Sequence, residues 1–204
     1  MKLNEGRRVI THLFDESLTK LGFSHAGALS FSRQSVDAIQ LISFSCRQNR
    51  MREGICFSFG AGVRFDAVED LLGVDPEQRL FPTISKPLSV LKSASGYPEW
   101  CLNEDTDLSV VRLEVVHDIE SYALPFLDRY STLDSVCSQL SKEDPRQWFV
   151  LDPEQRIATL SAITHVKGDT AGALRILDEA LQERSNAPEK LRFRLEKLRA
   201  RLVV

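Results

Sequence analysis

Glu114 and His117 have the spacing in this sequence that most resembles a catalytic pair. They lie three positions apart, so on a helix their side chains can touch, and a carboxylate beside an imidazole can transfer protons. Ser121 lies four positions beyond His117 and within its reach, whereas the adjacent Asp118 points about 100° away around a helix. Helical pairs at these spacings are ordinary surface contacts, so we favour a surface role over a catalytic one.

Other catalytic patterns are missing from the sequence. No Gly-x-Ser-x-Gly elbow exposes a serine nucleophile, and no Gly-x-x-x-x-Gly-Lys loop cradles a phosphate. The cysteines are far apart, with no Cys-x-x-Cys pair and no nearby histidine, although metal sites and redox motifs need closer spacing. We interpret all four as buried thiols in a reducing compartment. They are Cys46, Cys56, Cys101 and Cys137. We predict no catalytic residue, metal site or cofactor.

An acidic segment follows the middle of the chain. Between Glu99 and Glu120 there are seven acids and a single base, Arg112. Acids near a helix start stabilise the helix dipole, but this explanation covers only those nearest the start. A negative surface also attracts a basic partner and accelerates its capture. The partner-binding residues that we predict are Tyr97, Glu99, Trp100, Glu104, Asp105 and Asp107.

The two tryptophans allow a second interpretation. Trp100 beside the acids is the kind of aromatic anchor that is enriched at interfaces. A half-buried ring that closes the core is nevertheless the safer interpretation of both Trp100 and Trp148. At the other end of the chain, residues 184–201 carry seven bases against two acids, with Phe193 as their one aromatic neighbour. This pattern disfavours nucleic acid as a partner, because cations near a helix end also stabilise the helix locally.

The elements that must position these residues follow from hydrophobic periodicity. A helix over residues 5–21 precedes three β-like runs, which short links should join into an antiparallel meander packed against that helix. Glycines around the third run predict a turn before it and a bulge within it. The three runs are Phe23–Arg33, Ser35–Arg47 and Ile55–Phe65.

The middle of the chain, residues 67–101, reads as an irregular connection with one short helical turn. A helical period returns from Asp107 to Tyr122, and Pro125 predicts a kink or restart before a second helical stretch that reaches Leu140. The pentapeptide Asp-Pro-Glu-Gln-Arg occurs at 75–79 and at 152–156, where Asp as N-cap and Pro at the first position predict helix starts.

After Pro145 the sequence predicts three helices. The last carries a leucine seam that packs either within the chain or across a dimer, and its members are Leu191, Leu195, Leu198 and Leu202. We therefore predict an α+β fold, with an N-terminal helix on a small antiparallel sheet and a helical C-terminal region. The predicted domains are 1–145, the α+β domain, and 146–204, a helical hairpin followed by a basic helix.

Short patterns in residues 5–140 resemble an uncharacterised bacterial family, domain of unknown function family 4304. The resemblance implies a fold and no established activity. Separately, residues 157–184 resemble a single tetratricopeptide-like helical hairpin. The patterns similar to the first family are Leu21-Gly22-Phe23, Phe31-Ser32-Arg33, Ala38-Ile39-Gln40-Leu41, Phe57-Ser58-Phe59-Gly60, Trp100-Cys101-Leu102 with Asp105 and Asp107, and Leu124-Pro125-Phe126-Leu127.

Composition supports a globular chain, with 43% hydrophobic and 27% charged residues. No run of eighteen apolar residues and no secretory signal is present, so we expect a cytoplasmic protein without a membrane partner.

The leading hypothesis is a non-catalytic protein-binding protein, an immunity protein that neutralises a toxin with a basic surface. The alternative is an enzyme or small-ligand-binding protein whose site assembles from Glu114, His117 and Arg47. A scaffold that self-associates through its C-terminal hairpin is a third hypothesis.

Overall fold

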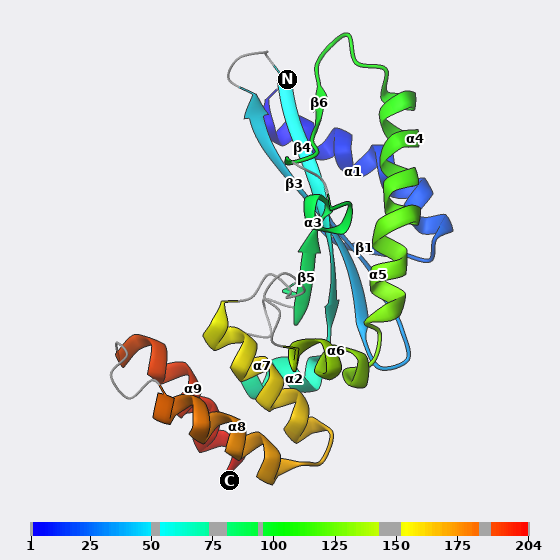
Figure 1. The fold of residues 1–204 in the computed structure, drawn as a ribbon. Coiled ribbons are helices and arrows are strands. Elements are labelled where there is room, and N and C mark those ends of the chain that lie inside the picture. Colours follow the sequence, from blue (N-terminus) through cyan, green and yellow to red (C-terminus); the bar gives the residue numbers. More distant parts are fainter. Residues whose placement is uncertain are drawn as a thin grey trace.

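An antiparallel sheet forms the upper part of the protein, and helices form the lower part (Figure 1). The structure is a computed structural model, and it describes residues 2–49, 54–73, 81–93, 96–142, 152–183 and 189–203. The strand order is β1-β2-β3-β4, with β5 and β6 sharing the far edge of β4. The strands are β1 (Ser24–Gly27), β2 (Ser30–Gln34), β3 (Ile39–Asn49), β4 (Gly54–Arg64), β5 (Ile84–Pro87) and β6 (Trp100–Leu102). The predicted α+β class is confirmed.

One face of the sheet packs on helix α1 (Leu3–Lys20). Phe14 of α1 stacks on Phe44 of β3 with ring centroids 4.9 Å apart, and it also contacts the ring of Phe57 on β4. All three rings are almost fully buried. The predicted helix and its stripe toward the sheet are confirmed, because the apolar side chains of α1 recur at the helical period and face the aromatic side of the strands.

Strand β4 is buried on both faces and paired on both edges. All its residues are buried except Gly60, which is half-buried. The register with β3 runs without interruption from Ile39 opposite Arg64 to Asn49 opposite Gly54, so the predicted bulge is wrong. The glycine at position 62 serves a close contact instead, since a Cβ there would lie 2.5 Å from Cβ of Pro82.

Two further predictions about strands need correction. The first β-like run is a hairpin of two strands, β1 and β2, because the chain turns between Gly27 and Ser30. The middle of the chain holds β5 and β6 as well as helices α2 (Asp66–Leu72) and α3 (Leu88–Leu91). Strands of three or four residues are too short to show a reliable alternation of apolar and polar side chains, which is why the sequence reads as irregular here.

The chain stays helical through Pro125, so no restart occurs there, and the second helical stretch ends at Arg129 instead of reaching Leu140, which belongs to a separate helix, α6 (Leu133–Leu140). Helix α4 (Leu108–Asp118) passes through a π-helical turn (Ile119–Ala123) into α5 (Leu124–Arg129). The backbone N–H of Leu124 donates to the carbonyl of Ile119, five residues back. Pro125 has no N–H to donate, and a wider turn before it lets the chain remain helical past the proline.

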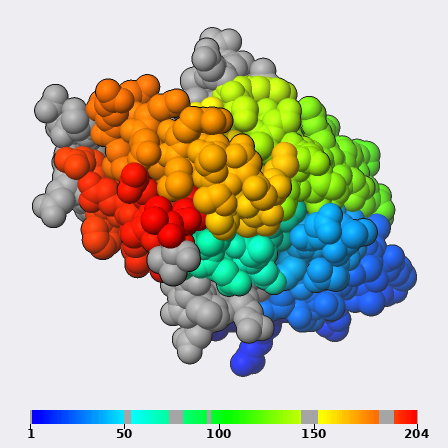
Figure 2. Space-filling model, turned by 90° about the horizontal axis from the view of Figure 1, so that it is seen from below, coloured from blue at the N-terminus to red at the C-terminus, as the bar shows by residue number. Residues whose placement is uncertain are grey.

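The C-terminal helices pack against α2, on which α7 and α9 rest (Figures 1 and 2). Asp152 caps α7 by accepting from the backbone N–H of Gln155 at 2.6 Å, as predicted, while the first pentapeptide lies outside the described residues. Leu195, Leu198 and Leu202 are buried, so this part of the leucine seam packs within the chain. The helices are α6 (Leu133–Leu140), α7 (Pro153–Val166), α8 (Thr170–Glu183) and α9 (Glu189–Leu202).

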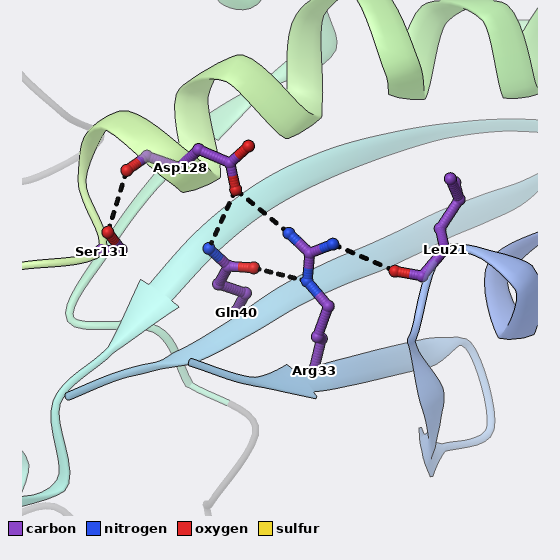
Figure 3. Close-up of polar contacts among 5 residues, drawn as sticks. All are labelled: Leu21, Arg33, Gln40, Asp128 and Ser131. Carbon is purple, nitrogen blue, oxygen red and sulfur yellow. Dashed lines mark hydrogen bonds and ion pairs between the residues drawn. The ribbon is translucent and has the colours of Figure 1, made fainter. Parts of the chain in front are cut away.

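Arg33 of β2 ties four elements together (Figure 3). Its guanidinium donates to the side-chain oxygen of Gln40 at 2.8 Å, to the carbonyl of Leu21 at 3.0 Å and to the carboxylate of Asp128 at 3.1 Å. It also lies 4.8 Å above the ring centroid of Phe23. The end of α1, the strands β2 and β3, and helix α5 are therefore joined through one side chain.

Replacement of Arg33 by alanine should lower the free energy of unfolding by about 2 kcal/mol, because Gln40 is buried and would lose its charged donor. Urea unfolding followed by circular dichroism measures this change. Lys20→Ala removes only an exposed ion pair with Glu16 and should change stability by less than about 0.5 kcal/mol. Equal losses in the two variants would show that Arg33 does not hold these elements together.

A buried carboxyl group lies where β4 passes into α2. Glu69 is 4% exposed and accepts a hydrogen bond of 2.6 Å from the hydroxyl of Thr83, which in turn accepts from the backbone N–H of Phe65. Burial raises the pKa of Glu69, while the Thr83 hydrogen bond and the charge of Arg64 oppose the rise. The folded protein therefore holds the Glu69 proton to a higher pH than the unfolded chain does.

Glu69 should make stability fall as pH rises from its ordinary pKa of 4.5 toward the raised value, because the unfolded chain releases this proton first. Glu69→Gln keeps an acceptor for Thr83 and should abolish that part of the decline. Urea unfolding of both proteins between about pH 4 and pH 8 tests the expectation, with the exposed Glu179→Gln as control. A stability difference between wild type and Glu69→Gln that is constant over this range would contradict it.

Candidate functional site

Trp100 lies at the start of β6, where pairing with β4 sets its position. It stands opposite Phe57, and its ring stacks on Phe57 and on Phe59, with centroids 5.6 Å and 6.2 Å apart. Its indole N–H donates to the carboxylate of Glu114 at 2.9 Å. Trp100 is thus a half-buried ring that closes the core, and Trp148 lies outside the described residues.

Glu99 and Tyr97 precede Trp100 on the same edge of the sheet. The carboxylate of Glu99 forms a two-pronged ion pair with Arg47 of β3, at 2.6 Å and 3.1 Å. Tyr97 is 56% exposed and, with Glu99, Arg47 and Cys56, lines a shallow hollow of about 360 Å³. Glu99 is therefore already paired within the chain, whereas the ring of Tyr97 faces solvent.

A cleft of about 290 Å³ separates this edge from α4 and brings Glu114 and His117 together. Within the described residues the two side chains share no hydrogen bond, and one oxygen of Glu114 accepts from Trp100 instead. Asp118 is held by Lys92, whose Nζ lies 3.0 Å and 2.9 Å from its two oxygens.

Arg47 does not line the cleft and is joined to it only through its ion pair with Glu99. The side chains lining the cleft are therefore engaged in structural pairs, with His117 the exception among the described titratable groups there. The lining residues are Lys92, Pro98, Glu99, Trp100, Glu114, His117 and Asp118.

The loop from β6 to α4 carries the other predicted acids. Asp107 caps α4: its carboxylate accepts from the hydroxyl and backbone N–H of Ser109, which lower its pKa, and from the N–H of Val110. The helix-start role thus accounts for Asp107. Glu104 and Asp105 are exposed and have no ion-pair partner among the described residues. Hydrogen bonds within residues 103–106 hold this loop in one shape.

Helix α4 presents apolar side chains on its outer face as well as its inner face. Val111 and Val115 point into the core, and Leu108 lies on the same stripe but is 39% exposed at the first residue of the helix. Val110 and Leu113, on the opposite side, are 49% and 68% exposed. The helical period of the sequence predicts one inner stripe, of which Val111, Val115 and Ile119 are buried, whereas Leu108 is exposed and Tyr122 is half-buried. The sequence itself indicates a second covered side, because apolar residues occur all around this helix, which is typical of a helix that packs on more than one side. We define the α4 face as Val110 and Leu113 together with Glu104 and Asp105 of the loop that leads into α4.

Within the described ranges, no three histidine, cysteine, aspartate or glutamate side chains come together in a way that could hold a metal ion. No helix in the same ranges has the length and apolar character that a bilayer crossing requires. Comparison of the chain with protein-family models, curated proteins and solved structures finds no match. The resemblances expected from the sequence stay predictions.

The interpretation of the cysteines is wrong for two of them. Cys56 of β4 and Cys101 of β6 stand directly opposite each other and form a disulfide bond. Cys46 and Cys137 are free thiols that are only partly buried. The pair was missed because 45 positions separate its members and only the pairing of β4 with β6 brings them together. Disulfides persist mainly in oxidising compartments, so this bond counts against a reducing one.

Cys101→Ser should lower the free energy of unfolding by about 2–4 kcal/mol, because the disulfide shortens a long loop of the unfolded chain. Urea unfolding without reductant measures the loss, and Cys46→Ser, which removes a free thiol, is the matched control. Titration of thiols in the unfolded, unreduced protein should find two. Four titratable thiols would show that the bond does not form.

Proposed function

We propose that this protein is a non-catalytic binding protein that captures a basic protein partner on the α4 face. The observation that carries the proposal is the exposure of Val110 and Leu113 on the outer side of α4, whose preceding loop holds two exposed carboxylates that lack a cationic partner among the described residues. Exposed apolar groups next to unpaired charge are typical of interaction surfaces, since the apolar centre supplies affinity and the charged rim supplies attraction.

The chemistry of the partner follows from charge complementarity. Seven acids and one base lie between Glu99 and Glu120, and the paired acids Glu99 and Asp118 each use a cation from elsewhere in the chain. Glu104, Asp105, Glu114 and Glu120 remain without an ion pair in the described part of the chain. A partner with lysines or arginines around an apolar patch would fit this surface.

The further steps of the hypothesis belong to the same proposal. The partner would be a toxin and this chain its bacterial immunity protein, acting by occlusion. The cytoplasmic location expected from the sequence is not part of this proposal, because the disulfide between Cys56 and Cys101 counts against a reducing compartment. Trp100 supports α4 through its bond to Glu114, whereas Tyr97, which lines the hollow with Arg47 and Cys56, would make a separate contact with the partner. The enzyme alternative has less support, because Glu114 and His117 share a cleft without forming a hydrogen-bonded pair.

The test is capture of partners from the native lysate at low and high salt, followed by affinity measurement on the partner found. Val110→Ser with Leu113→Ser should weaken binding at least tenfold at either salt, because it removes the apolar centre. Glu104→Gln with Asp105→Asn should mainly slow association and reduce the salt dependence.

The control is a matched double variant, Val36→Ser with Asp37→Asn. Val36 is 94% exposed and Asp37 is its exposed acidic neighbour, but both lie on the turn between β2 and β3. This variant should bind as wild type does. A stoichiometric partner that binds all three variants equally would place the binding surface elsewhere, and the absence of any partner would overturn the proposal.

A further inference from the structure

A cavity of about 320 Å³ lies at the junction of the sheet domain and the C-terminal helices. Its walls come from α2, from residues 81–83 before β5, from α7 and from α9. Its size is at the lower end of the range for small-molecule sites. Helices α2, α7 and α9 lie at the opposite end of the molecule from the loop between β6 and α4 (Figure 1).

The inner wall of the cavity carries polar groups whose capacity for hydrogen bonds is not filled by the described residues. The hydroxyl of Thr159 is buried, with the residue 1% exposed, and it has no hydrogen-bond partner among the described residues. The carboxyl group of Glu69 accepts from Thr83 through one oxygen, and no partner for the second is found among the described residues. A buried hydroxyl without a partner costs free energy, which a ligand would recover by hydrogen bonding to it.

The wall of the cavity that α9 forms carries positively charged side chains. Arg194, Lys197 and Arg201 recur at the helical period and all line the cavity. Arg201 donates to the carbonyl of Leu71 at 2.7 Å, and Arg194 lies 3.7 Å from the carboxylate of Asp152. Lys197 has no ion-pair partner in the described part of the chain. This explains part of the basic character of residues 184–201: three of these bases converge on one cavity.

Two phenylalanines provide the apolar part of the lining. Phe81 and Phe193 are each 62% exposed, and neither ring contacts another aromatic ring in the described ranges. The backbone at Phe81 is fixed, because its carbonyl accepts from the buried Arg64 at 3.1 Å. Exposed aromatic rings beside cations are suited to a planar ring that carries a negative group.

We propose that this cavity is a binding site for a small aromatic anion. The ring of the ligand packs on Phe81 and Phe193, its phosphate or carboxylate binds Lys197 and Arg194, and a polar ring substituent reaches the hydroxyl of Thr159. The protonated form of Glu69, which burial favours, can donate to the same ligand. This site goes beyond the proposed capture of a protein partner and does not depend on it.

Titration calorimetry with phenyl phosphate and with benzoate as probes tests the site and separates the two anionic groups. At least one should bind the wild-type protein with one-to-one stoichiometry. Lys197→Gln should weaken that binding roughly tenfold through loss of a charge-assisted hydrogen bond, and Phe193→Ala should weaken it by a similar factor. Both side chains are exposed, so the thermal midpoint of each variant should stay near that of wild type.

The controls separate this site from a general attraction of anions. Lys20→Gln removes the same charge from α1 and should bind the probe as wild type does. Val110→Ser with Leu113→Ser should also leave probe binding intact, so that failure here and failure of the protein-binding proposal are distinguishable. Inorganic phosphate should bind at least tenfold more weakly than phenyl phosphate. Binding of neither probe, equal affinity for inorganic phosphate, or unchanged affinity in Lys197→Gln would overturn the inference.

Discussion

The pairing of β4 along both of its edges is the constraint on which the rest of the structure depends. On one side it runs in unbroken register with β3, and on the other it receives β6 at residues 55–57 and β5 at residues 60–63. A strand with neighbours on both edges and cover on both faces must be apolar or small at almost every position. A glycine is needed in β4 where Pro82, just before β5, packs against the strand. Pro82 occupies the space that a side chain at Gly62 would need.

The two ends of β4 position two different surfaces. At its start, β6 places Trp100 over Phe57 and sets Cys101 against Cys56, and the loop beyond β6 carries the acids that precede α4. At its end, Arg64 binds the carbonyl of Phe81, and Thr83 links the backbone of Phe65 to Glu69. One strand thus supports the α4 face at one end and the wall of the basic cavity at the other.

Much of the fold was accessible from the sequence because its signals are local. The stripe of α1 and the cap at Asp152 each depend on residues within one or two helical turns, and both are confirmed. The acidic segment was visible for the same reason. The outer apolar side chains of α4, Val110 and Leu113, are also local in sequence, but they lie off the single buried stripe that helical periodicity predicts.

Hydrophobic periodicity, capping residues and charge runs by themselves determined the helices, the long strands and the acidic surface, because these follow from neighbours along the chain. Only the tertiary structure decided which distant residues meet. The short strands β5 and β6 form because β4 offers them an edge, and the disulfide between Cys56 and Cys101 follows from that pairing. The basic cavity likewise requires α2, α7 and α9 to meet. Such contacts depend on burial and close approach in three dimensions, which a pattern along the chain does not encode.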